Sequence, residues 1–118
     1  MRDEPLTIEA VPGSSENTTI LRLRGPLTMG TLFPLQDGFR AQASAVVILD
    51  CYGVPYLDSA GLGSIMMLYA SAERHGRRMM LAGVSERVMS LIRMTRVDTV
   101  LSIVGSVEEA ENSQRRPG

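Results

Sequence analysis

Residues 45–61 read AVVILDCYGVPYLDSAG and decide the fold. The run that ends at Asp50 is apolar without alternation and rich in β-branched residues, which is typical of a strand covered on both faces. A glycine and a proline between Cys51 and Leu57 predict a loop. The pattern after Asp58 predicts a helix from about Ser59 to about His75. A buried strand followed by a loop and a helix indicates the repeating unit of a parallel α/β sheet.

The chain before this segment predicts a hairpin and a helix. Residues 6–10 alternate between apolar and polar, and residues 20–24 (ILRLR) predict a second short strand. The turn residues between these runs predict an antiparallel hairpin with a long loop. Apolar residues then recur at helical spacing; they are Leu32, Leu35, Phe39 and Ala43. We expect this helix to begin at Thr31 or Thr28.

The chain after the central helix predicts two more strands and two more helices. The strands cover residues 78–83 and 100–104, with a helix capped by Ser85 between them. A short acidic helix then runs from Ser106 through Glu111. The predicted fold is therefore α/β: a mixed, mostly parallel sheet of four to five strands with about four helices and an antiparallel N-terminal hairpin at its edge. We expect one domain over residues 1–111 and a disordered tail over residues 112–118.

Composition excludes several classes of protein. The 118 residues carry a formal net charge of −1, which argues against direct binding of nucleic acid. One cysteine, Cys51, allows neither an intrachain disulfide nor a metal site built on cysteines. No apolar run approaches the roughly 20 residues of a membrane span. We expect a cytoplasmic protein that needs no cofactor, with Cys51 as a small loop residue.

The first turn of the central helix is the candidate site. Asp58 and Ser59 stand where a helix presents free N–H groups and partial positive charge, so a phosphate on Ser59 would be accommodated there. Gly61 and Gly63 weaken that helix by about 1 kcal/mol each relative to alanine. Such a cost suggests that something approaches the backbone closely. The local chemistry alone favours a plainer interpretation, in which Asp58 caps the helix and the glycines allow packing.

Three segments, in order, resemble the STAS domain of anti-sigma factor antagonists. They are Leu23-Arg24-Gly25-Pro26-Leu27-Thr28, the strand Val46–Asp50, and Leu57-Asp58-Ser59-Ala60-Gly61-Leu62-Gly63. The resemblance covers about residues 6–111. It implies a STAS-like fold and a protein that is not an enzyme.

The resemblance assigns Ser59 as the phosphorylation site and Asp58 as the aspartate that supports the reaction and the contact. It implies a kinase partner that is itself the anti-sigma factor, with the ATPase fold of histidine kinases, and a PP2C-type phosphatase that resets the switch. Ala60 stands where many relatives carry a second hydroxyl, and Pro26 replaces a frequent acid. We expect a monomer or weak homodimer whose partner-binding residues are Asp58, Ser59, Ala60, Gly61, Gly63, Met67 and Thr28.

The residues around Ser59 argue against an enzyme. Ser59 could be a nucleophile, but the hydrolase elbow requires glycine where Leu57 stands. His75, the one histidine, lies about 24 Å along the same helix at about 1.5 Å per residue, too far to act as a base. Domains similar to STAS also serve as scaffolds in stress-signalling complexes and as subunits of lipid or anion transporters, and these alternatives stay open.

Overall fold

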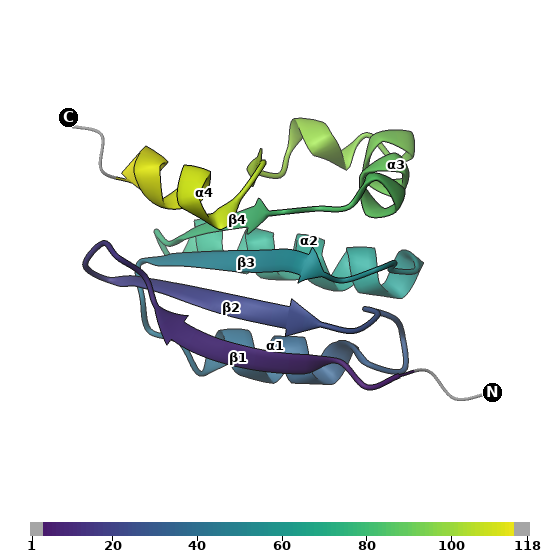
Figure 1. Ribbon diagram of the computed structural model, residues 1–118, viewed down its shortest axis with the longest axis horizontal. Helices are drawn as coiled ribbons and strands as arrows, with labels where there is room; N and C mark the ends of the chain where they lie inside the picture. The colour runs from purple at the N-terminus through teal and green to yellow at the C-terminus, as the bar shows by residue number, and fades with distance from the viewer. Residues whose placement is uncertain (1–3, 115–118) are drawn as a thin grey trace.

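The computed structural model describes residues 4–114, which form five strands, four α-helices and one 3-10 turn. Figure 1 shows them as one layered α/β unit. In chain order the elements are β1 (Thr7–Pro12), β2 (Thr18–Arg24), α1 (Leu32–Arg40), β3 (Val46–Gly53), α2 (Ser59–Arg74), β4 (Arg78–Ala82), α3 (Glu86–Met94), η1 (Val97–Thr99), β5 (Ile103–Val104) and α4 (Val107–Gln114).

The sheet is mixed and mostly parallel, as the sequence predicted. Its strand order is β1-β2-β3-β4-β5, so each strand pairs with its neighbours in sequence. The edge strand β1 is antiparallel to β2, and every other pair is parallel. The N-terminal hairpin therefore forms one edge of an α/β sheet, and the predicted fold class is confirmed.

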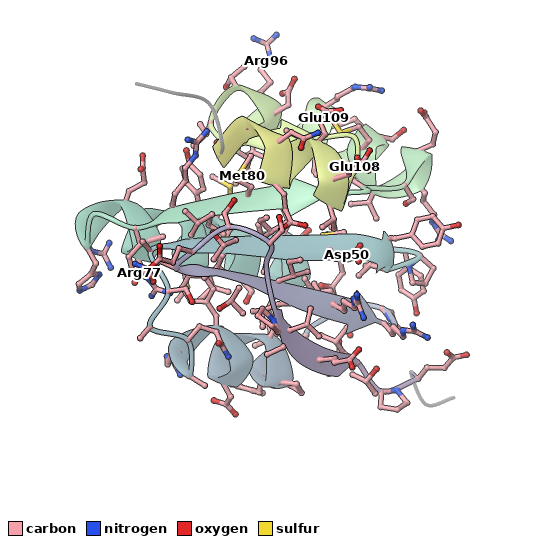
Figure 2. The ribbon with its side chains drawn as sticks, turned by 60° about the vertical axis from the view of Figure 1, so that its left-hand side comes forward. Asp50, Arg77, Met80, Arg96, Glu108 and Glu109 are labelled. Carbon is pink, nitrogen blue, oxygen red and sulfur yellow. The ribbon has the colours of Figure 1, made fainter. Side chains whose placement is uncertain are left out.

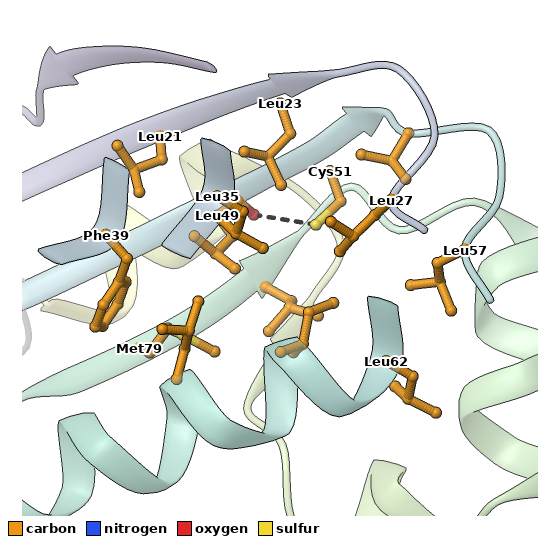
Figure 3. Close-up of a cluster of buried hydrophobic side chains, with 14 of the residues drawn as sticks. Leu21, Leu23, Leu27, Leu35, Phe39, Leu49, Cys51, Leu57, Leu62 and Met79 are labelled. Carbon is orange, nitrogen blue, oxygen red and sulfur yellow. Dashed lines mark hydrogen bonds between the residues drawn. The ribbon is translucent and has the colours of Figure 1, made fainter. Parts of the chain in front are cut away.

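Side chains of the central strands alternate between two separate cores. Leu21, Leu49 and Leu81 belong to the larger core, which also contains buried residues of α1, α2 and α3. Ile48 and Met80 point to the opposite face, where Ala110 of α4 covers them. Figure 1 shows α1 and α2 behind the sheet and α4 in front of it, and Figure 3 shows the leucines of the larger core. β3 is therefore buried on both faces, as its unbroken apolar sequence predicted.

Strand β3 extends further than expected. The predicted loop over residues 51–57 is wrong at its start, because β3 continues to Gly53. Gly53 pairs with Arg24 of β2 after a register shift in the ladder. Cys51 is therefore a buried strand residue, not a loop residue, and its thiol donates to the Leu49 carbonyl oxygen at 3.6 Å.

Three predicted boundaries also need correction. Helix α1 ends at Arg40, and Ala43 is exposed beyond it. The predicted strand 100–104 shortens to β5, because Arg96 adopts a positive φ of 63° and begins the 3-10 turn η1. Helix α4 continues to Gln114, past its expected end at Glu111. Residues 115–118 of the expected tail lie outside the described residues.

Candidate functional site

Asp58 caps the start of α2, as the sequence predicted. Its backbone is extended, with φ −104° and ψ −176°, and its side-chain Oδ1 accepts a hydrogen bond from the Gly61 N–H at 2.8 Å. Its carbonyl oxygen accepts the first helical bond, from the Leu62 N–H at 2.9 Å. An aspartate in this geometry satisfies one of the donors that a helix leaves unpaired at its start.

The second carboxylate oxygen of Asp58 reaches another part of the chain. Asp58 Oδ2 accepts a hydrogen bond from the Met29 N–H at 3.1 Å. Leu27 is held beside the same residue, because its carbonyl oxygen accepts from the Asp58 N–H at 3.2 Å and its own N–H donates to the Tyr56 carbonyl at 3.1 Å. The loop that follows β2 is thus fixed against the start of α2. Sequence reasoning missed Met29, since no local pattern reports a contact between residues so far apart.

Thr28 lies inside this loop rather than on its surface. The side chain is buried, and its Oγ1 accepts from the Gly30 N–H at 3.3 Å. Its backbone N–H donates to Thr31 Oγ1 at 2.9 Å, and Thr31 Oγ1 donates in turn to the Pro26 carbonyl at 2.7 Å. These bonds fix the shape of the loop that carries Met29.

Ser59 is the first residue of α2 and is exposed. Within residues 4–114 its hydroxyl has no hydrogen-bond partner, which leaves the oxygen accessible to chemistry from outside. Ala60, the next residue, is half-buried against the larger core. Ser59 therefore lies on a helix N-terminus that would favour added negative charge, next to a carboxylate that already has two N–H partners.

The two glycines after Ser59 have opposite surroundings. A side chain on Gly61 would collide with the Leu27 carbonyl oxygen, so this glycine is required for the close approach of the loop to α2. A side chain on Gly63 would meet nothing within 4 Å. The packing explanation therefore holds for Gly61, and Gly63 leaves a flat, open place on the helix surface.

Large exposed apolar side chains lie on α2 itself, on the loop fixed to its start and on the adjacent helix α1. Ser59, Gly63 and Met67 recur at intervals of four and so lie on one face of α2; we call them the Ser59 stripe. Met67 is 62% exposed, and Met29 of the fixed loop is 67% exposed. Phe33, which sequence reasoning also missed, is 63% exposed in the first turn of α1. Large apolar residues exposed together are typical of a surface that contacts another protein.

The remaining reactive side chains lie away from Ser59. Burial and the neighbouring charge of Asp50 raise the pKa of the Cys51 thiol from 9.0 to about 12, so it stays protonated and unreactive. His75 caps the opposite end of α2, with its Nδ1 at 2.7 Å from the Ser71 carbonyl. Across residues 4–114 there is no group of His, Cys, Asp or Glu side chains that could hold a metal ion.

A family comparison identifies this arrangement of a capped helix, a fixed loop and a mixed sheet. The STAS domain model matches residues 10–110. The chain belongs to the STAS domain family. The match begins in β1 and ends in α4, so the STAS domain includes all the elements that position Ser59.

Solved structures show the same fold. The protein TM1081 from Thermotoga maritima is 22% identical, with a TM-score of 0.78 over 92% of this chain and 95% of that one. An anti-sigma factor antagonist from Mycobacterium paratuberculosis is 16% identical, with a TM-score of 0.79 over 93% and 96%. The Bacillus anti-sigma factor antagonist SpoIIAA, in its unphosphorylated form, is 15% identical, with a TM-score of 0.72 over 95% and 100%. At these identities the likeness establishes the fold.

The same fold occurs in transport proteins. A sulfate transporter family protein from Wolinella succinogenes is 20% identical, with a TM-score of 0.69 over 84% of this chain and 85% of that one. In the part of this STAS domain that the structure describes, every helix is too short or too polar to cross a membrane.

Proposed function

We propose that this STAS domain is an anti-sigma factor antagonist controlled by phosphorylation of Ser59. In its unphosphorylated form it binds an anti-sigma factor kinase with the ATPase fold of histidine kinases, and a sigma factor is released. The kinase phosphorylates Ser59 and ends the contact, and a PP2C-type phosphatase restores it. The observation that carries this proposal is the exposed Ser59 hydroxyl at the first position of α2, directly after the Asp58 cap.

The partner supplies the chemistry of this switch. No histidine of the described chain lies near Ser59, because His75 stands at the other end of α2. The hydroxyl therefore has no base of its own domain to activate it. In the proposed complex Ser59 is an acceptor, and the domain acts by binding rather than by catalysis.

Electrostatic repulsion explains why phosphorylation would weaken binding to the partner. A phosphate adds a charge of about −1.5 to −2 and lands next to the Asp58 carboxylate. Asp58 is held in place by the Gly61 and Met29 N–H groups, so it is not free to rotate away. In the isolated domain the helix N-terminus and water offset the new charge. In a complex that charge would be buried among apolar side chains, which weakens binding without a change of fold.

The docking surface of this proposal is the Ser59 stripe with Asp58, Ala60, Met29 and Phe33. Gly61 and Thr28 act from beneath it, since both are buried and both fix the loop that carries Met29. Gly63 keeps the surface flat where the partner backbone would approach. The contact residues expected from the sequence therefore divide into exposed residues and residues that support them from beneath.

Two substitutions test the proposal. We expect Ser59→Ala to bind the kinase within about twofold of the unmodified chain, and Ser59→Asp to bind about a hundredfold more weakly or worse, because a buried like charge costs several kcal/mol. Isothermal titration measures both affinities. Ser90→Asp is the matched control, since Ser90 is an exposed serine of α3. Equal affinities of the Ser59→Ala and Ser59→Asp variants would contradict the switch.

A second candidate is a subunit of an anion transporter or of a stress-signalling scaffold that lacks the switch. The likeness to the Wolinella succinogenes sulfate transporter family protein favours the transporter. A transporter subunit would co-purify with a membrane permease and carry no phosphate on Ser59 in cells. The phospho-switch instead requires a phosphate on Ser59 in cells and no co-purifying permease.

A further inference from the structure

The groove between α1 and α2 continues the proposed docking surface toward its basic end. A hollow of about 510 Å³ lies between these helices. Its lining includes Gln36, Phe39, Arg40, Met67, Ala70 and Arg74. Met67 also belongs to the Ser59 stripe, so the hollow and the phosphorylation site share one face of α2. The contact between Gln36 Nε2 and Ser64 Oγ at 3.4 Å joins the two helices above the hollow.

Positive charge gathers at the far end of this groove. Arg40 and Arg74 stand in the last turns of α1 and α2, and both are exposed. Arg77 lies beneath them, held by the Ser44 and Gln42 carbonyls at 2.9 and 3.0 Å and stacked over the Phe39 ring at 4.9 Å. In Figure 2 Arg77 and Asp50 lie at opposite ends of the sheet, so the basic end is remote from the loop that leads to Ser59.

The acidic residues nearby leave this charge largely available. Asp37 Oδ1 lies 3.9 Å from Arg40 Nη1, which is a loose contact. The Arg40 side chain is 66% exposed and the Asp37 side chain is 78% exposed. Such surface pairs contribute about 0–1 kcal/mol. Glu73 precedes Arg74 on α2, so three arginines, Arg40, Arg74 and Arg77, stand against the two acids Asp37 and Glu73. In a chain of net charge −1, the groove therefore ends in a local excess of positive charge.

We propose that this groove binds an acidic, amphipathic helical segment of the same protein partner that contacts Ser59. Apolar side chains of that segment would pack on Met67 and Ala70, above the buried Phe39, and its carboxylates would pair with Arg40 and Arg74. An apolar floor with a charged rim fits helix-in-groove recognition. A phosphate backbone fits less well, because Asp37 and Glu73 flank the same rim. The partner's identity rests on the proposed function, but the groove and its chemistry do not.

This second contact would hold the partner while Ser59 reacts. Ser59 and Arg74 lie about 22 Å apart along α2 at about 1.5 Å per residue. A phosphate on Ser59 is therefore beyond two Debye lengths of about 8 Å from the basic end at physiological salt. Phosphorylation weakens the contact at one end of the surface and leaves the acidic segment's site intact.

A peptide titration tests the groove directly. The probe is a helical peptide of about 15 residues, long enough to follow α2, with leucine at every third or fourth position and glutamate elsewhere; the control peptide carries glutamine for glutamate. In ¹⁵N-labelled chain we expect the acidic peptide to shift the amide signals of Arg40, Ala70 and Arg74. The double variant Arg40→Glu, Arg74→Glu should bind it at least about tenfold more weakly.

Matched variants keep the test specific. Arg24→Glu with Arg93→Glu makes the same change of charge at exposed sites on β2 and α3, and should alter the affinity by less than about twofold. Circular dichroism checks that both double variants fold. Equal binding of the two peptides, shifts that map outside the groove, or displacement of the acidic peptide by anionic phospholipid vesicles would overturn the proposal.

The kinase separates this inference from the proposed function. With both correct, Arg40→Glu with Arg74→Glu raises KM for phosphorylation of Ser59 about tenfold and leaves kcat unchanged. If the kinase phosphorylates Ser59 of this double variant with an unaltered KM, the groove contact is contradicted and the switch is supported. If the acidic peptide binds in the groove but no kinase phosphorylates the chain, the switch is contradicted and the groove contact is supported.

Discussion

At the scale of single residues, Gly61 and Gly63 differ in what surrounds them. Each glycine is equally unfavourable near the start of a helix, so the sequence gives both the same weight. Only Gly61, however, faces the Leu27 carbonyl oxygen. The sequence indicates that both glycines are unusual, but it cannot tell which one is needed for packing, because the packing contact comes from a loop more than thirty residues upstream of Gly61. The open surface at Gly63 is the part of this signal that the fold does not explain.

Alanine substitutions at the two glycines should therefore have opposite effects on stability. We expect Gly61→Ala to lower the free energy of unfolding by about 2–3 kcal/mol, because the added methyl group displaces the loop. Gly63→Ala should raise it by about 0.5–1 kcal/mol, since alanine favours an exposed helix position. Urea unfolding measures both. Similar changes in the two variants would contradict the assignment.

Cys51 provides a test of the buried end of β3. Its raised pKa means that the folded chain keeps the thiol protonated where the unfolded chain ionises it, from pH 9.0 up to about 12. The unfolded state then binds fewer protons than the native state, so the free energy of unfolding falls as pH rises, by about 1.4 kcal/mol per pH unit for this group.

Two measurements check this account of Cys51. Iodoacetamide should leave the folded chain unmodified at pH 8 and should label it in urea. The stability of the wild-type chain should also fall more steeply above pH 9.0 than that of Cys51→Ala, which lacks the titrating group. Labelling of the folded chain at the rate of the unfolded chain would show that the thiol is not buried.

At the scale of elements, Asp58 joins the loop after β2 to the start of α2. The sequence predicted the helix cap from Asp58 itself, because capping depends on residues within one turn. It did not predict the bond to the Met29 N–H, which depends on how β2 and β3 align in the sheet. Local signals of this kind are readable in a sequence, and contacts between distant loops are not.

Asp58→Ala should lose both contacts. We expect the free energy of unfolding to fall by about 1–2 kcal/mol, with faster hydrogen exchange at the amides of both Gly61 and Met29. Asp58→Asn keeps an oxygen acceptor and should retain most of the stability. Faster exchange at Gly61 alone would show that the loop is held by its other bonds and that Asp58 does not fix Met29.

The lengths of strands β3 and β5 also differ from what their sequences predict, one longer and one shorter. β3 exceeds its prediction because Gly53 pairs with Arg24 after a register shift, which no pattern in residues 51–57 announces. β5 falls short of its prediction because Arg96 turns the chain into η1, and Val100 stays 50% exposed. Hydrophobic runs predicted that these strands exist, and pairing with neighbours decided where they end.

At the scale of the whole molecule, the sheet explains why one face carries the site. Parallel strands deliver their following loops to one end, and there the loops after β2 and β3 meet at Asp58. α4 occupies the other face of the sheet, over Ile48 and Met80. α1 and α2 lie side by side behind the sheet in Figure 1, so the groove between them extends the surface that begins at Ser59.

The proposed switch requires that the chain carry a phosphate on Ser59 in cells, and this can be measured directly. The measurement is the intact mass of the chain isolated from its own cells, followed by peptide mapping, for the wild type and for Ser59→Ala. We expect a form carrying one phosphate, mapped to Ser59 and absent from Ser59→Ala. A phosphate mapped to another residue, or its persistence in Ser59→Ala, would contradict it.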